Sequence, residues 1–89
     1  MANEIREEAG RFSTVVDGHK AHVDFDRTDG TIVITYTRVP TDIGGRGVAA
    51  DLVKAAFDAA RRDGIKVSPV CSYAAVWLEK HPDYADLLR

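Results

Sequence analysis

This sequence has one cysteine, no net positive charge and no long apolar run, and each of these features argues against a class of protein. Cys71 is the one cysteine among 89 residues, so no internal disulfide can form and we expect a reducing, cytoplasmic location. Twelve basic and fourteen acidic side chains give a net charge of −2, which argues against a nucleic-acid partner. No apolar run is long enough to span a membrane, and the polar first ten residues do not resemble a secretory signal.

Metal ligands are scarce as well. His19 and His22 lie close together, and Asp24 and Asp26 follow them at alternate positions. A metal site needs more ligands than these histidines offer, and alternating charged residues are typical of the solvated face of a strand. We therefore expect no metal site.

The remaining composition is that of one small globular domain. The sequence is 45% hydrophobic and 29% charged, as in ordinary folded proteins. Residues 1–10 are polar and rich in acidic side chains, so we expect a disordered tail there and a folded domain over residues 11–89.

The first half of the chain predicts antiparallel strands. Asp17 and Gly18 separate two alternating runs, which is a strong signal for a tight hairpin. A second turn is expected over residues 28–30. The β-branched run over residues 31–39 predicts a central strand that ends at Pro40, because proline cannot donate to a strand ladder.

The second half changes to a helical period. Apolar residues recur at helical spacing over residues 47–63, and Gly64 then offers a left-handed cap. A short strand is expected over residues 65–70, followed by a helix over residues 73–80 capped by Ser72. The predicted class is α+β: three antiparallel strands, a right-handed strand–helix–strand crossover with a parallel strand, and a C-terminal helix.

A glycine cluster lies between the central strand and the long helix. Gly44, Gly45 and Gly47 surround Arg46 at the point where the free amides and the positive end of the helix converge. An anion fits such a place, but a plain turn needs glycine too. The cluster matches neither the phosphate loop of nucleotide hydrolases nor the dinucleotide fingerprint.

With the small residues that open the next helix, the cluster resembles the GNAT superfamily of acetyl-CoA-dependent N-acetyltransferases. The resemblance assigns the pyrophosphate of acetyl-CoA to the loop and first helical turn: Gly44, Gly45, Arg46, Gly47, Val48 and Ala49. Gly44 stands where the family usually has arginine or glutamine, so the backbone must do more of the binding. The backbone from Tyr36 to Val39 is implied to pair with the pantetheine arm.

The segments "VSPVCSY" and "HPDY" narrow the resemblance to the very short GNAT-like proteins, over residues 11–87. In that subgroup the cysteine, here Cys71, is the proposed catalytic residue. His81 is implied to contact the adenosine, although packing at a helix end explains it equally well. Tyr36 and Arg38 replace the usual histidine and glutamate. Tyr36 is a poor base but can donate a hydrogen bond to an oxyanion.

Two mechanisms fit the resemblance. Cys71 can accept the acetyl group and pass it to an amine, or an amine can attack acetyl-CoA directly while Cys71 shapes the site. Taken without the resemblance, Cys71 is better explained as a small buried hydrophobe, and the resemblance shifts the balance to a role in the site. The alternative function is a non-catalytic module that binds coenzyme A. The resemblance implies an unidentified amine acceptor, and we expect a monomer or weak dimer.

Overall fold

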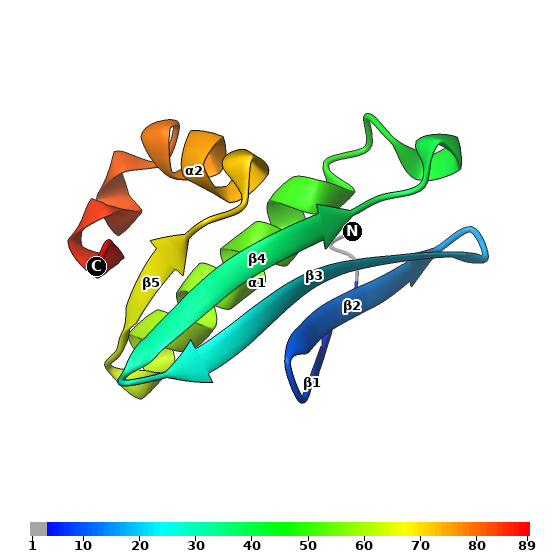
Figure 1. Ribbon diagram of the computed structural model, residues 1–89. Helices are drawn as coiled ribbons and strands as arrows, with labels where there is room; N and C mark the ends of the chain where they lie inside the picture. The colour runs from blue at the N-terminus through cyan, green and yellow to red at the C-terminus, as the bar shows by residue number, and fades with distance from the viewer. Residues whose placement is uncertain (1–3) are drawn as a thin grey trace.

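The computed structural model describes residues 4–89 as a five-stranded sheet with helices against one side (Figure 1). The strands are β1 (Arg6–Glu8), β2 (Arg11–Val16), β3 (His19–Thr28), β4 (Thr31–Arg38) and β5 (Lys66–Pro69). The helices are the short 3-10 turns η1 (Thr41–Ile43) and η2 (Pro82–Leu87) and the α-helices α1 (Val48–Asp63) and α2 (Ser72–Glu79). Strands β1 to β4 pair antiparallel in chain order, and β5 adds parallel to β4. The α+β class is confirmed, with one more antiparallel strand than the three expected.

The additional strand is β1, so the prediction of a disordered tail is wrong for residues 4–10. Residues 1–3 lie outside the described part of the chain. Arg6 pairs with Ser13, and Glu8 pairs with Arg11 across a tight turn. The Ser13 hydroxyl also donates to the Glu8 carboxylate over 2.5 Å. The strand pairing satisfies the backbone of this polar segment, and the side-chain bond from Ser13 adds a second link to β2.

Both expected hairpin turns are confirmed. Asp17 and Gly18 have φ angles of 50° and 79°, and Asp29 and Gly30 have φ angles of 49° and 68°. These left-handed conformations match the right-handed twist of the flanking strands, which explains the Asp-Gly pair at each turn.

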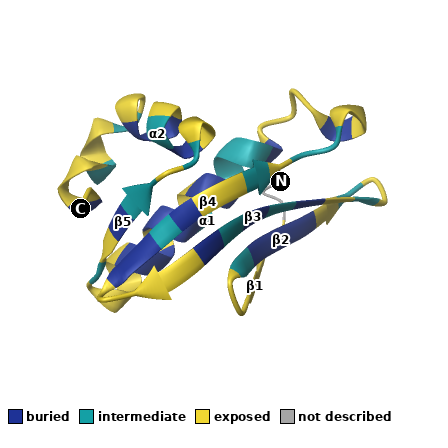
Figure 2. Cartoon of the chain, in the orientation of Figure 1, coloured by how far each residue is buried: buried dark blue, intermediate teal, exposed yellow. Residues whose placement is uncertain are grey.

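Helix α1 packs along the sheet and carries much of the core (Figure 2). It ends as expected at Gly64, whose φ of 69° lets its N–H donate to the carbonyls of Ala60 and Arg61. The fully buried Phe57 stacks on Trp77 of α2 with ring centroids 5.0 Å apart. This stack fixes α2 against the middle of α1.

The prediction that Ser72 caps the last helix is wrong by one residue. The Cys71 carbonyl already accepts the first helical bond, from the N–H of Ala75 over 3.1 Å. Cys71 is therefore the N-cap, and Ser72 is the first helical residue. In the described residues, no helix has the length and apolar character that crossing a bilayer requires.

Strands β4 and β5 stay paired for only part of their length. The ladder runs from Thr31 opposite Lys66 to Ile34 opposite Pro69. The last link is the Cys71 N–H, which donates to the Ile34 carbonyl over 2.9 Å. Beyond it, β5 turns away into α2 while β4 continues (Figure 1). Among the described residues no strand pairs with this last part of β4, which we call its free edge.

Candidate active site

A β-bulge in β4 decides which side chains face α1. In the β3–β4 ladder, Phe25 lies opposite Ile34. The next pair joins Asp24 to Tyr36, which leaves Thr35 as an extra residue on β4. Because side chains alternate along a strand, one extra residue reverses the faces of all residues that follow it.

Beyond the bulge, Thr37 therefore faces the α1 side, because it lies opposite the buried Val23. Tyr36 faces the other side, opposite Asp24. We call that other side the open face. Its side chains near the end of β4 are Arg11, His22, Asp24, Tyr36 and Arg38.

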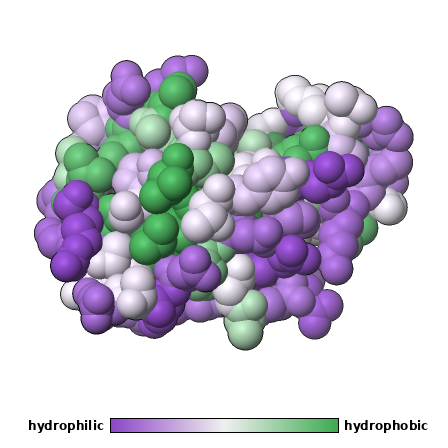
Figure 3. Space-filling view, in the orientation of Figure 1, coloured by the Kyte–Doolittle hydropathy of each residue, from purple (hydrophilic) through white to green (hydrophobic). Residues whose placement is uncertain are grey.

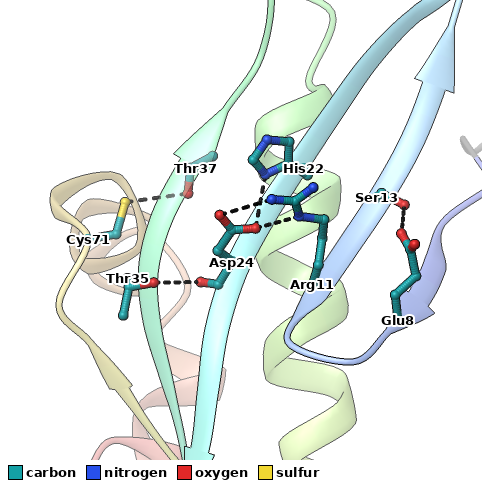
Figure 4. A network of polar contacts seen from close by, with 8 residues as sticks. All are labelled: Glu8, Arg11, Ser13, His22, Asp24, Thr35, Thr37 and Cys71. Carbon is teal, nitrogen blue, oxygen red and sulfur yellow. Dashed lines mark hydrogen bonds and ion pairs between the residues drawn. The ribbon is translucent and has the colours of Figure 1, made fainter.

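Cys71 meets Thr37 on the α1 side of β4, where β5 has turned away. Its Sγ lies 3.4 Å from the Thr37 Oγ1 (Figure 4). Burial raises the pKa of the thiol, but the hydrogen bond with Thr37 and the backbone groups of Ala74 and Tyr73 lower it more. The pKa of Cys71 thus lies below its ordinary value, which favours the nucleophilic thiolate.

The glycine cluster borders a hollow of about 290 Å³ between β4, α1 and α2. Its lining residues are Val39, Thr41, Ile43, Gly44, Gly45, Gly47, Val48, Ala49 and Tyr73. Figure 3 shows a notch in the surface between α2 and the segment that carries η1. The structure therefore brings together six of the predicted coenzyme residues, from Val39 to Ala49.

Several backbone amides along this hollow lack a backbone partner. The Gly44 N–H donates to Thr41, and the Asp51 N–H donates to Gly47 as the first bond of α1. Within residues 4–89, the amides between these two have no backbone acceptor. Gly45 and Gly47 have φ angles of 79° and 77°, and a Cβ at either would meet no atom within 4 Å. Free amides, open space and the positive end of α1 fit the pyrophosphate that the resemblance implied.

Arg46 is oriented away from this role. Its guanidinium forms an ion pair with the Asp17 carboxylate at the tip of the β2–β3 hairpin, and both side chains are at least half exposed. Arg46 is not among the residues that line the hollow. In this structure, the loop therefore offers backbone amides and no cationic side chain.

The comparisons with known proteins agree with this geometry. A family model described as GCN5-related N-acetyl-transferase matches residues 11–87. The chain belongs to this family. It is therefore an acyltransferase, and acetyl transfer is its general activity.

A solved structure supports the same family and the GNAT-like fold. The matched structure is that of a GCN5-like candidate N-acetyltransferase from Staphylococcus aureus, determined in solution by NMR. It is 32% identical to this chain, and the match covers 100% of this chain and 91% of that one with a TM-score of 0.77. The two domains thus share one architecture over nearly their whole length.

The two residues predicted as catalytic in this acetyltransferase lie on opposite sides of β4. Tyr36 is 49% exposed on the open face, whereas Cys71 contacts Thr37 on the α1 side. The structure does not bring the phenol and the thiol together. The nearest aromatic partner of Tyr36 is His22, with ring centroids 6.1 Å apart.

His81 also lies apart from the loop of the acetyltransferase. Its ring stacks on Trp77 with centroids 4.0 Å apart, and its Nδ1 lies 2.7 Å from the Trp77 carbonyl oxygen. It does not line the hollow. The structure accounts for His81 by packing at the end of α2, and a contact with adenosine stays a prediction.

The sequence did not indicate a polar network on the open face (Figure 4). Asp24 accepts from the Arg11 Nε over 2.7 Å and lies 3.1 Å from the His22 Nδ1. Burial raises the pKa of Asp24, but the bond from Arg11 and the charge of His22 lower it more, so the carboxylate is stabilised. We expected solvated charges here, yet the His22 side chain is only 13% exposed. His22 and Asp24 are two residues apart on one strand, so their side chains lie on the same face. This spacing is the sequence signal that could have indicated the pair.

Proposed function

We propose that this acyltransferase moves an acetyl group from acetyl-CoA to an amine, with the glycine loop binding the pyrophosphate and Cys71 near the acyl group. The main support is one continuous track. Tyr73 and Val39 line the hollow, Cys71 stands two residues before Tyr73, and Thr37 stands two before Val39. The loop and the thiol are thus joined through the start of α2 and the end of β4.

The free edge of β4 supports a path between the two ends of this track. Strand β5 stops pairing at Ile34, so within residues 4–89 no strand pairs with the backbone that follows on that edge. An extended ligand chain with amide groups can add to such an edge as a further strand. On this proposal, the backbone from Tyr36 to Val39 binds the pantetheine arm.

Bound acetyl-CoA would supply an activated acyl group as a thioester. The Cys71 thiolate has the lone pair needed to accept that acyl group, and Thr37 orients the sulfur. Exchange between two thioesters is nearly thermoneutral, so an acetylated Cys71 is a reasonable covalent intermediate. The direct route differs only in that Cys71 shapes the site without being acetylated.

Arg46 and Arg38 modify this scheme. Arg46 can contribute to phosphate binding only after it exchanges Asp17 for the ligand. Arg38 is exposed at the end of β4 on the open face. A guanidinium there favours acceptors that carry an acidic group beside the amine.

The test combines calorimetry with intact mass measurement. We expect acetyl-CoA to bind, the wild-type chain to gain one acetyl group, and Cys71→Ser to bind coenzyme A normally without becoming acetylated at that position. Binding without acetylation but with transfer to amines would favour the direct route. Binding with neither would favour the coenzyme A binding module, and the absence of binding at high micromolar concentration would refute the proposal.

A further inference from the structure

His22, Asp24 and Arg11 form a histidine–carboxylate pair braced by a guanidinium on the open face. Asp24 is held by Arg11 Nε at 2.7 Å and by a second guanidinium nitrogen at 3.4 Å. The same carboxylate faces His22 Nδ1 at 3.1 Å. We propose that His22 accepts the proton that the acceptor ammonium must lose, and that Asp24 and Arg11 position it. This inference rests on the proposed amine acceptor.

The hydrogen bond to Asp24 selects the useful form of the imidazole ring. A carboxylate can only accept, so neutral His22 carries its proton on Nδ1 and keeps a lone pair on Nε2. In Figure 4 the second ring nitrogen points away from Asp24. Asp24 thus fixes both the tautomer and the direction of the ring.

The location of His22 suits an acceptor that approaches over β4. Its partner across the ladder is Arg38, and its ring neighbour is Tyr36. His22 lies on β3, and the free edge of the neighbouring strand β4 borders Cys71. Adjacent strands are about 4.8 Å apart, so His22 is one strand spacing from β4. On this proposal, the acceptor amine lies above Tyr36 on the open face, next to His22, and reaches the acyl group past the free edge of β4.

Charged groups surround His22 from each neighbouring strand. Asp24 lies on its own strand, Arg11 on β2 and Arg38 on β4. Ser13 of β2 lies opposite His22, and its hydroxyl donates to Glu8 of β1. His22 therefore has one carboxylate and two guanidinium groups as its charged neighbours on the open face.

The proton-transfer step is simple. One N–H bond of the acceptor ammonium breaks, its electron pair stays on the nitrogen, and the proton bonds to His22 Nε2. The imidazolium then returns the proton to water. The step is needed in both routes, because an ammonium cannot attack either acetyl-CoA or an acetylated Cys71.

The matched variants are His22→Gln and His19→Gln, which remove two histidines of the same strand. His19 is more exposed and is paired with Asp42. We expect His22→Gln to lower kcat for transfer to lysine or glutamate by roughly 10²–10⁴-fold with unchanged coenzyme A affinity. His19→Gln should stay near wild type. Asp24→Asn should lower kcat less and shift the pH profile, because it misorients the base without removing it.

A second measurement does not depend on finding the acceptor. Nitrogen-15 correlation spectra of the histidine rings should show the Nδ1-protonated tautomer for His22 in the wild type and its loss in Asp24→Asn. A proton on Nε2, or equal rates for His22→Gln and His19→Gln, would overturn the role of His22. If the wild type binds coenzyme A but transfers acetyl to no amine, the proposed function fails instead, and this inference fails with it.

Discussion

Gly47→Ala tests whether the loop binds its ligand through the backbone. Gly47 is the N-cap of α1 with φ of 77°, and Gly64 is the C-cap of the same helix with φ of 69°. A Cβ at either position would meet nothing within 4 Å. The two glycines therefore have the same backbone requirement at opposite ends of one helix, and only Gly47 borders the hollow.

The stability cost should be equal for the two variants. Placing alanine in the left-handed region destabilises the folded state by roughly 1–2 kcal/mol. Alanine also restricts the unfolded chain more than glycine does, which offsets this loss by about 0.4–1 kcal/mol. The net cost is about 1 kcal/mol, which lowers Tm by about 4–8 °C in a domain of this size. Circular dichroism melts should show similar shifts for Gly47→Ala and Gly64→Ala.

The affinity for coenzyme A should distinguish Gly47→Ala from Gly64→Ala. At Gly47 the new methyl group enters the space that the pyrophosphate would occupy beside the free amides. Losing one hydrogen bond to a charged oxygen costs about 1.5–3 kcal/mol, which weakens binding by about 10- to 150-fold. Calorimetry should show this loss for Gly47→Ala and unchanged affinity for Gly64→Ala. Equal affinity in both variants would refute the backbone cradle.

Three further variants test the core, the thiol and the open-face network. Phe57→Ala should cost about 3–5 kcal/mol in urea denaturation, because this fully buried ring leaves a cavity; a cost below about 1 kcal/mol would contradict the packing. Thr37→Val should raise the pKa of Cys71 and slow its alkylation at neutral pH, whereas Thr37→Ser should keep the rate. The pKa of Asp24 is lowered on folding, so its stabilisation exists above the ordinary carboxyl pKa of about 3.9 and is lost as pH falls through the folded value. Asp24→Asn should therefore destabilise the chain at neutral pH by an amount that shrinks in acid, and a deficit that grew in acid would contradict the bond to Arg11.

The parts of the fold that depend on local chemistry could be predicted. Both Asp-Gly turns need left-handed backbone, and few other residue pairs supply it. Helix α1 has a continuous apolar face and a glycine at its C-terminal end. The parts that depend on pairing alone could not be predicted. Strand β1 consists of three exposed polar residues and exists only because β2 offers it an edge.

The bulge at Thr35 is the most consequential feature that the sequence could not reveal. The strand is β-branched at most positions, so nothing in its pattern marks an extra residue. Without the bulge, strict alternation from the buried Ile34 would direct Tyr36 toward α1. With it, Thr37 takes that side and meets Cys71, while Tyr36 turns toward the open face.

This reversal changes the meaning of the tyrosine that replaces the usual histidine of the short subgroup. Tyr36 lies on the same face as His22, with ring centroids 6.1 Å apart, so the site has a histidine on the neighbouring strand. On the proposal above, the imidazole is the proton acceptor, and the phenol can then act as a hydrogen-bond donor. Tyr36→Phe should accordingly lower the rate of acetyl transfer less than His22→Gln. The opposite order would place the essential proton transfer on the phenol and refute the division of roles.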